Sequence, residues 1–173
     1  MSTLPAALSR VRPAVEHRLE EVLSGCRRRW EDLGQAAPEL LDAAGSILGG
    51  GKRMRAVLGA VGCALLTTPE RRAERLTSSD AVGLGTALEL YQASALIHDD
   101  LMDGADTRRG LPAAHRFFAR DHDARGWLGP SQTFGTNGAI LLGDLLLSLA
   151  GEEMSALART HTSCEPADKA LWR

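Results

Sequence analysis

The sequence predicts an all-α fold. Apolar residues recur at three- and four-residue spacing through most of the chain, no stretch alternates with period two between turn signals, and glycine and proline fall between the apolar segments. The 173 residues are 44% apolar, which is enough for one sizeable core. A single domain over residues 1–173 is therefore expected.

Two amphipathic helices are predicted first. Valine and leucine recur at helical spacing over residues 11–23, and a second apolar stripe covers residues 40–48. Pro38 is well placed at the start of the second helix, because proline fits the first helical turn. The three glycines at 49–51 end it.

A third and a fourth helix follow. The third begins at Lys52, ends before Pro69, and is expected to turn five apolar residues inward: Met54, Val57, Leu58, Val61 and Leu65. Ser78, Ser79 and Asp80 offer N-caps for a long helix that reaches about Asp103. Its interior, residues 82–97, is almost wholly apolar, so this helix should lie in the middle of a bundle.

The second half of the chain predicts two more helices and one partial one. Residues 104–112 indicate a loop, residues 113–120 a short helix, and residues 121–138, with five glycines or prolines, a longer connection. Residues 139–154 predict another buried helix. Glu165-Pro166 opens a further helical stretch that runs to Arg173.

Charge and cysteine content restrict the partners and the compartment. The net charge of −2, with 20 basic and 22 acidic residues, argues against nucleic-acid binding. Cys26, Cys63 and Cys164 are odd in number and far apart, which favours a reducing compartment, and the cytoplasm is expected. No segment approaches the roughly 18 uninterrupted apolar residues of a membrane span, so a membrane-spanning protein is not expected.

Carboxylates cluster at the end of the long helix. Asp99 and Asp103 lie one turn apart and could hold one divalent cation, while Gln92 lies two turns back. The alternative is a solvated helix end, but acids at a helix C-terminus oppose the macrodipole and repel one another unless a cation is present. Oxygen ligands favour Mg²⁺ over Zn²⁺. His98 is expected to be a packing residue. The alternative is that His98 and Asp99 are the active residues of a histidine-aspartate phosphohydrolase.

Two basic segments could bind phosphate. Arg108-Arg109 follow the aspartates closely, and adjacent guanidinium groups can serve two different phosphates near one metal site. In the segment Gly49-Gly-Gly-Lys52-Arg53-Met54-Arg55, glycines expose backbone N–H groups at a helix start, where the dipole favours anions. The alternative is a helix C-cap followed by exposed basic residues. The segment is not a P-loop, because no strand precedes it.

These motifs together resemble the trans-isoprenyl diphosphate synthases, the all-α polyprenyl synthetases. The resemblance covers roughly residues 40–154 and rests on GGGKRMR at 49–55 and HDDLMDGADTRRG at 98–110, with ELYQASALI before the aspartates and GAILLGDLLL at 138–147. It implies an isoprenoid-synthase-type helical bundle, here apparently incomplete. It also implies condensation of isopentenyl diphosphate with an allylic diphosphate and, as in the family, a homodimer.

The resemblance assigns roles to individual residues. Asp99 and Asp103, with Asp100 assisting, would bind Mg²⁺, and Asp99, Asp103 and Arg108 would be catalytic. Arg108 would hold the allylic diphosphate. The residues expected to bind isopentenyl diphosphate are Lys52, Arg55, Gln92 and Arg109, and Arg53 belongs to the same substrate-binding segment.

Product length is expected to depend on the helix face before the first aspartate. Ser94 and Ala95 are small and would leave room beyond a fifteen-carbon chain, while Tyr91, roughly one turn deeper, would form a floor. A product of about twenty carbons, geranylgeranyl length, is the resulting hypothesis.

One departure from the family pattern matters. The second aspartate-rich motif of the family does not occur in this sequence, and Glu152, Glu153, Glu165 and Asp168 lack its spacing. We expect the chain to be the N-terminal portion of a longer synthase and inactive alone. The alternatives are a naturally short, non-catalytic binding or regulatory subunit, a proteolytic product, and the metal-dependent phosphohydrolase named above.

Overall fold

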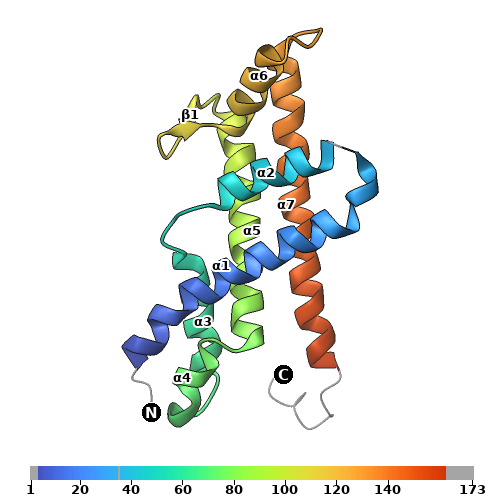
Figure 1. Ribbon diagram of the computed structural model, residues 1–173. Coiled ribbons are helices and arrows are strands. Elements are labelled where there is room, and N and C mark those ends of the chain that lie inside the picture. Colours follow the sequence, from blue (N-terminus) through green and yellow to red (C-terminus); the bar gives the residue numbers. More distant parts are fainter. Residues whose placement is uncertain (1–3, 35, 163–173) are drawn as a thin grey trace.

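A computed structural model describes residues 4–34 and 36–162, and within them the chain is a helical bundle with one small hairpin (Figure 1). The α-helices are α1 (Leu4–Arg29), α2 (Ala36–Leu48), α3 (Met54–Leu65), α4 (Arg72–Arg75), α5 (Ser79–Met102), α6 (Ala114–Ala124) and α7 (Ser131–Thr162). Short 3₁₀ turns cover Glu31–Leu33 and Pro69–Arg71, and the hairpin pairs β1 (Thr107–Arg108) with β2 (Leu111–Pro112). The all-α prediction is confirmed apart from this hairpin.

Helix α5 is the centre of the bundle. It packs against α7 along much of its length and also contacts α1, α2, α3 and α6, while α1 and α2 cross in front of it in Figure 1. Ser78 caps its N-terminus, because the Ser78 Oγ accepts a hydrogen bond from the Ala81 N–H at 3.3 Å. Leu90 and Ile97 are buried in its interior. The predictions of the cap and of a central helix are therefore correct.

Helices α1 and α2 bury the stripes that the spacing predicts. Val11, Val15 and Leu19 are buried on α1, and Leu41 and Leu48 on α2. One core cluster joins buried residues of α1, α2, α3, α5, α6 and α7. Burial of this common apolar surface holds the site-bearing elements in fixed positions relative to one another.

The inward face of α3 differs from the expectation. Ala56, Ala60 and Ala64 are buried, whereas Met54 and Leu65 are exposed, as is Leu58. Val57 and Val61 are partly buried, as predicted. Because the helix presents small alanines to α5, the two helices approach closely, and the larger side chains are left on the outer face. Helix α3 also begins at Met54, after Lys52 and Arg53.

The long connection predicted over residues 121–138 is wrong. Helix α6 continues to Ala124 and α7 begins at Ser131, so only residues 125–130 connect them. Two of the glycines that indicated a loop instead lie at the α6–α7 contact. A Cβ built on Gly135 would collide with the His115 carbonyl oxygen, and one on Gly138 would lie 2.8 Å from the Phe118 ring. Close helix packing overrides the low helix propensity of glycine here.

The hairpin that follows α5 was not expected. Arg109 and Gly110 form its two-residue loop and both have positive φ, 54° and 80°, which is typical of a type I′ turn. In the described part of the chain, no helix is long and apolar enough to cross a membrane. The helical stretch predicted from Glu165 lies outside the described residues.

Candidate active site

The aspartate cluster divides between solvent and interior at the end of α5. Asp99 and Asp103 are exposed one turn apart, and the Asp103 N–H donates to the Asp99 carbonyl at 2.9 Å. Asp100 is 4% exposed and points inward. Asp99 and Asp103 thus form an exposed pair of carboxylates at the C-terminal end of a helix, where a cation is electrostatically favoured.

Arg108 binds the inward carboxylate. Its Nε donates to Asp100 Oδ1 at 2.9 Å and to Oδ2 at 3.0 Å, and its Nη2 contacts Asp100 Oδ1 as well. Its Nη2 also lies 3.4 Å from Asp99 Oδ2. Hydrogen bonding to Asp100, opposed by desolvation, raises the pKa of Arg108 above its ordinary value. The pair fixes the hairpin against the end of α5.

Asp100 was expected to assist in binding a metal, but in the structure its carboxylate contacts Arg108. Both of its oxygens accept hydrogen bonds from Arg108, so they are engaged by a guanidinium group. Among the described residues, no three or more His, Cys, Asp or Glu side chains converge on a point that could hold a metal ion. The carboxylates of Asp99 and Asp103 are exposed, and only that of Asp99 lies near Arg108, with its Oδ2 3.4 Å from the Nη2. As an oxygen-only pair they fit Mg²⁺, which takes one or two carboxylates together with substrate phosphates.

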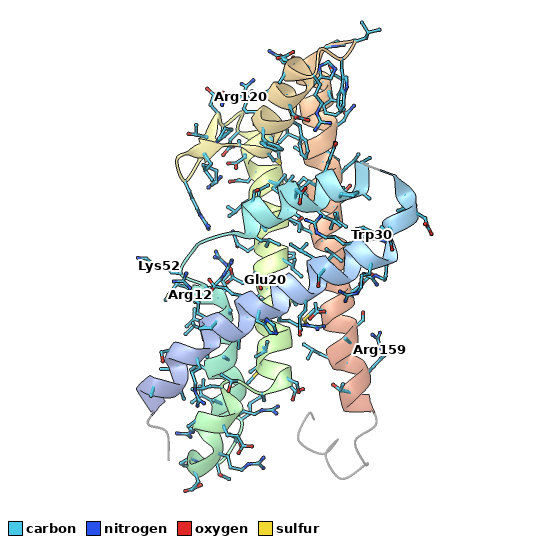
Figure 2. All side chains as sticks on the ribbon, viewed as in Figure 1. Arg12, Glu20, Trp30, Lys52, Arg120 and Arg159 are labelled. Carbon is cyan, nitrogen blue, oxygen red and sulfur yellow. The ribbon has the colours of Figure 1, made fainter. Side chains whose placement is uncertain are left out.

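The second arginine of the hairpin reaches the glycine turn between α2 and α3. Gly51 has φ of 93°, and a Cβ built on it would lie 3.2 Å from Arg109 Nη1. The two basic segments of the sequence therefore meet in space. Lys52 is exposed on this turn and extends from the loop (Figure 2), and Arg55 is exposed on the first turn of α3.

Arg53 does not point outward with its neighbours. Its side chain is 7% exposed, its Nη2 donates to the carbonyl of Leu48 at the end of α2, and its Nη1 donates to Glu89 Oε2 at 3.3 Å. Its backbone is left-handed, with φ of 51°. The Arg53 side chain, expected to contact a diphosphate, is engaged by internal contacts in this structure, because a cation is attracted to the carbonyl end of α2 and to a partly buried carboxylate.

Glu89 is a site residue that the motifs did not single out. It lies three residues before Gln92 on the same face of α5, and its Oε1 accepts a hydrogen bond from the Ala56 N–H at 3.4 Å. The sequence does mark this position, since Glu89 is the one charged residue in the largely apolar segment 82–97.

A cavity of about 300 Å³ lies between α2, α5, α6 and the hairpin. Charged and polar side chains form one part of its wall: Arg53, Glu89, Gln92, Asp100, Arg108 and Arg109. Apolar side chains form another part: Ile47, Leu96, Ile97, Leu111, Phe117 and Phe118. Gln92, Arg108 and Arg109 are brought together as predicted, whereas Lys52 and Arg55 lie outside this lining. The cavity can take a molecule with an anionic head and a short apolar chain.

The three residues expected to set chain length do not share one environment. Tyr91 and Ala95 are exposed, and they precede Asp99 by eight and four residues. Tyr91, Ala95 and Asp99 therefore lie on one stripe of α5. Ser94 is 3% exposed and buried in the helix packing instead. None of the three is part of the cavity lining within the described residues.

His98 lies at the contact of α5 with α7. Its Nε2 is 3.6 Å from Asp144 Oδ1, and its ring occupies the space beside Gly143. This position agrees with the predicted packing role.

The chain is similar to known proteins in both sequence and fold. The polyprenyl synthetase family model matches residues 37–170. Geranylgeranyl pyrophosphate synthase 11 of Arabidopsis thaliana is 38% identical over 112 residues, which are 64% of this chain and 25% of that protein. Geranylgeranyl diphosphate synthase of Methanosarcina mazei is 35% identical over 127 residues, 73% of this chain and 30% of that protein.

A solved structure extends the likeness to the fold. The geranylgeranyl pyrophosphate synthase of Corynebacterium glutamicum, complexed with isoprenyl diphosphate and magnesium, has a TM-score of 0.74 and 31% identity. The match covers 90% of this chain and 42% of that one, which confirms the predicted isoprenoid-synthase-type bundle. The chain spans between 25% and 30% of the length of the two curated relatives named above. With a family model matching most of its length, this chain belongs to the polyprenyl synthetase family.

Proposed function

We propose that this chain carries the isopentenyl diphosphate site and the first metal-binding carboxylates of a prenyltransferase that joins isopentenyl diphosphate to an allylic diphosphate. The observation that carries the proposal is the meeting of Arg109 with Gly51 beside the cavity that Gln92 and Arg108 line. Separate sequence motifs thereby form one anion-binding wall next to the exposed carboxylates of Asp99 and Asp103.

Isopentenyl diphosphate fits the cavity by chemistry and by size. Gln92 and Arg109 would hold its diphosphate from the cavity wall, and Lys52 and Arg55 would close over it from the glycine turn. The five-carbon chain would lie against Leu96, Ile97 and the other apolar lining residues. That apolar wall excludes water, which would otherwise quench an allylic cation.

The allylic diphosphate would lie across the exposed end of α5. Asp99 and Asp103 would hold Mg²⁺, whose charge favours departure of the diphosphate. Arg108 would contribute a donor from the hairpin while Asp100 keeps its guanidinium in place. The magnesium in the complex of the C. glutamicum synthase supports this choice of metal.

The product is proposed to have about geranylgeranyl length, as the names of the curated relatives suggest. The growing chain would follow the exposed stripe from Asp99 past Ala95 to Tyr91. If Tyr91 ends that path, Tyr91→Ala in an active synthase lengthens the product. An unchanged product distribution would reject Tyr91 as the floor.

We further propose a cytoplasmic homodimer. Within the described residues Cys26 and Cys63 are free thiols, which suits a reducing compartment. The exposed apolar residues on the outer faces of α3 and α7, such as Leu58, Leu65 and Leu147, offer surface for a partner.

Calorimetry with the 173-residue chain tests the proposed sites. Isopentenyl diphosphate should bind without metal, and an unreactive allylic diphosphate analogue should bind only with Mg²⁺. Asp103→Asn should abolish the second binding event and leave the first unchanged. If wild-type chain binds neither diphosphate, the proposed function is wrong.

A condensation assay separates the remaining alternatives. The second candidate, a binding subunit without turnover of its own, is favoured by the lack of a metal-binding cluster of three or more side chains in the described segments. We expect binding but no condensation by the chain alone. Condensation would contradict that expectation, and release of diphosphate without condensation would favour the phosphohydrolase acting through His98 and Asp99.

A further inference from the structure

We propose that Glu89 and Arg53 are positioning residues that hold the glycine turn at the isopentenyl diphosphate site, and that Arg53 does not bind the diphosphate itself. The inference rests on the proposed function of this cavity. We name the pair formed by these two side chains the Glu89–Arg53 clip.

The clip joins three elements through one carboxylate and one guanidinium group. Glu89 projects from α5, and its two oxygens accept from the Ala56 N–H in the first turn of α3 at 3.4 Å and from Arg53 Nη1 at 3.3 Å. Arg53 in turn donates to the Leu48 carbonyl at the end of α2. Through these side-chain contacts, the turn that leads from α2 into α3 is fastened to α5 at both of its ends.

The backbone of the turn depends on this fastening. Arg53 is one of two non-glycine residues in the described chain with positive φ, at 51°, a conformation that L-residues avoid. Such strain persists only where surrounding contacts hold it, and it is typical of ligand-binding turns. The clip supplies those contacts, because the Arg53 side chain is 7% exposed and the Glu89 side chain 12%.

The clip sets the place of the diphosphate-binding residues. Lys52 precedes Arg53 directly, Arg55 follows two residues later, and Gln92 lies one turn beyond Glu89 on α5. A shift of the Arg53 backbone would move Lys52 and Gly51, and with Gly51 the contact surface of Arg109. Glu16 also faces Arg53, with its Oε1 3.7 Å from Arg53 Nε, so the guanidinium is enclosed by two acids.

The effect of Glu89→Gln on isopentenyl diphosphate affinity distinguishes a positioning role of Glu89 from a purely electrostatic one. Glu89 lines the cavity, so its negative charge repels a bound diphosphate through space. If charge alone matters, Glu89→Gln tightens isopentenyl diphosphate binding. If the clip positions the turn, the same change weakens binding about tenfold, since a charged hydrogen bond that orders the site is lost.

A cycle of variants tests whether Arg53 contacts the ligand. Arg53→Met and Glu89→Gln break the same contact, so the double variant should bind isopentenyl diphosphate about as weakly as either single variant. Arg53→Met also removes the donor to the Leu48 carbonyl. If adding Arg53→Met to Glu89→Gln costs as much affinity as Arg53→Met costs in the wild type, Arg53 acts independently of Glu89, and the clip would be wrong.

Glu153→Gln is the matched control. Glu153 pairs with Arg18 at 2.8 Å, and its side chain is 10% exposed, close to the 12% of Glu89, but it lies on α7 and is not among the residues that line the cavity. This control should lower the thermal midpoint comparably without changing the dissociation constant. Glu89→Asp is the second variant, because it keeps the charge but is too short to reach both partners, and it should also weaken binding.

The experiment is calorimetric titration of isopentenyl diphosphate into the full chain and its variants, with helix content checked by circular dichroism. The clip is supported if Glu89→Gln and Glu89→Asp lower the affinity for isopentenyl diphosphate while Glu153→Gln leaves it unchanged. If the wild-type chain binds isopentenyl diphosphate and neither Glu89 variant weakens that binding, the clip is wrong and the proposed function stands. No binding by wild type overturns the proposed function, and the clip with it.

Discussion

Arg108 holds the buried carboxylate of Asp100 through both of its oxygens, at 2.9 and 3.0 Å, although Asp100 lies inside the aspartate motif. Neighbouring acids in that motif therefore have different tasks: Asp99 and Asp103 face solvent, and Asp100 anchors the hairpin that carries both arginines. In the proposed site, the inner carboxylate would orient the groups that bind phosphate, and the two exposed carboxylates would be the ones that hold a metal.

Asp100→Asn should destabilise the fold, whereas Asp103→Asn should not. Loss of the buried charge partner of Arg108 is expected to lower the free energy of unfolding by about 1–3 kcal/mol. Asp103 is exposed and one turn from Asp99, so its neutralisation relieves repulsion and should change stability by at most about 0.5 kcal/mol. Urea denaturation measures both. Equal destabilisation by the two variants would contradict the division of roles.

The contact between Gly51 and Arg109 can be tested with two alanine substitutions in the same turn. Gly50 and Gly51 both have positive φ, 73° and 93°, so either change to alanine costs about 1 kcal/mol of backbone strain. A Cβ on Gly51 additionally meets Arg109 Nη1 at 3.2 Å, whereas one on Gly50 meets nothing within 4 Å. Gly51→Ala should therefore displace Arg109.

The measurement is the dissociation constant of isopentenyl diphosphate together with the thermal midpoint. Both alanine variants should lose similar stability, but only Gly51→Ala should bind the diphosphate more weakly, by several-fold, because a displaced Arg109 loses a charged hydrogen bond. Weaker binding by Gly50→Ala to the same extent would show that strain in the turn, and not the contact with Arg109, controls affinity.

Part of this arrangement could be predicted from local sequence. The Ser78 cap and the apolar segment 82–97 indicate a long central helix, since capping and periodicity are local properties. The motif order also indicates which residues meet at the site, and Gln92, Arg108 and Arg109 do line one cavity.

Other features depend on tertiary contacts that a local pattern does not encode. Gly135 and Gly138 read as loop residues, but they lie inside α7 where α6 approaches closely. Arg109-Gly110 lacks the asparagine or aspartate that usually marks a type I′ turn. The inward turn of Arg53 depends on Glu89, 36 residues later in the chain.

The α6–α7 contact gives a prediction about stability. Gly135→Ala places a Cβ against the His115 carbonyl and should destabilise the protein by more than about 2 kcal/mol, because backbone cannot move aside cheaply. Gly151 lies on the same helix with open space around it, so Gly151→Ala should stabilise by about 0.5–1 kcal/mol through helix propensity. Chemical denaturation of both variants compares the signs. Stabilisation by Gly135→Ala would contradict the close packing.

His115 should make the fold sensitive to acid. It is 8% exposed, its Nδ1 has no hydrogen-bond partner among the described residues, and burial, aided by the charge of Arg116, lowers its pKa below the ordinary 6.5. The unfolded chain therefore binds a proton at His115 at a higher pH than the folded chain does. Stability is then lost as the pH falls below about 6.5, and the loss levels off below the folded-state pKa.

Replacing His115 with glutamine removes this proton linkage. Urea midpoints measured from neutral pH down to about pH 5 should fall less steeply for His115→Gln than for wild type, even if the variant is less stable at every pH. The comparison of slopes separates proton linkage from packing, because a cavity or a lost contact lowers stability by the same amount at each pH. Parallel curves for the two proteins would show that acid sensitivity arises at other groups.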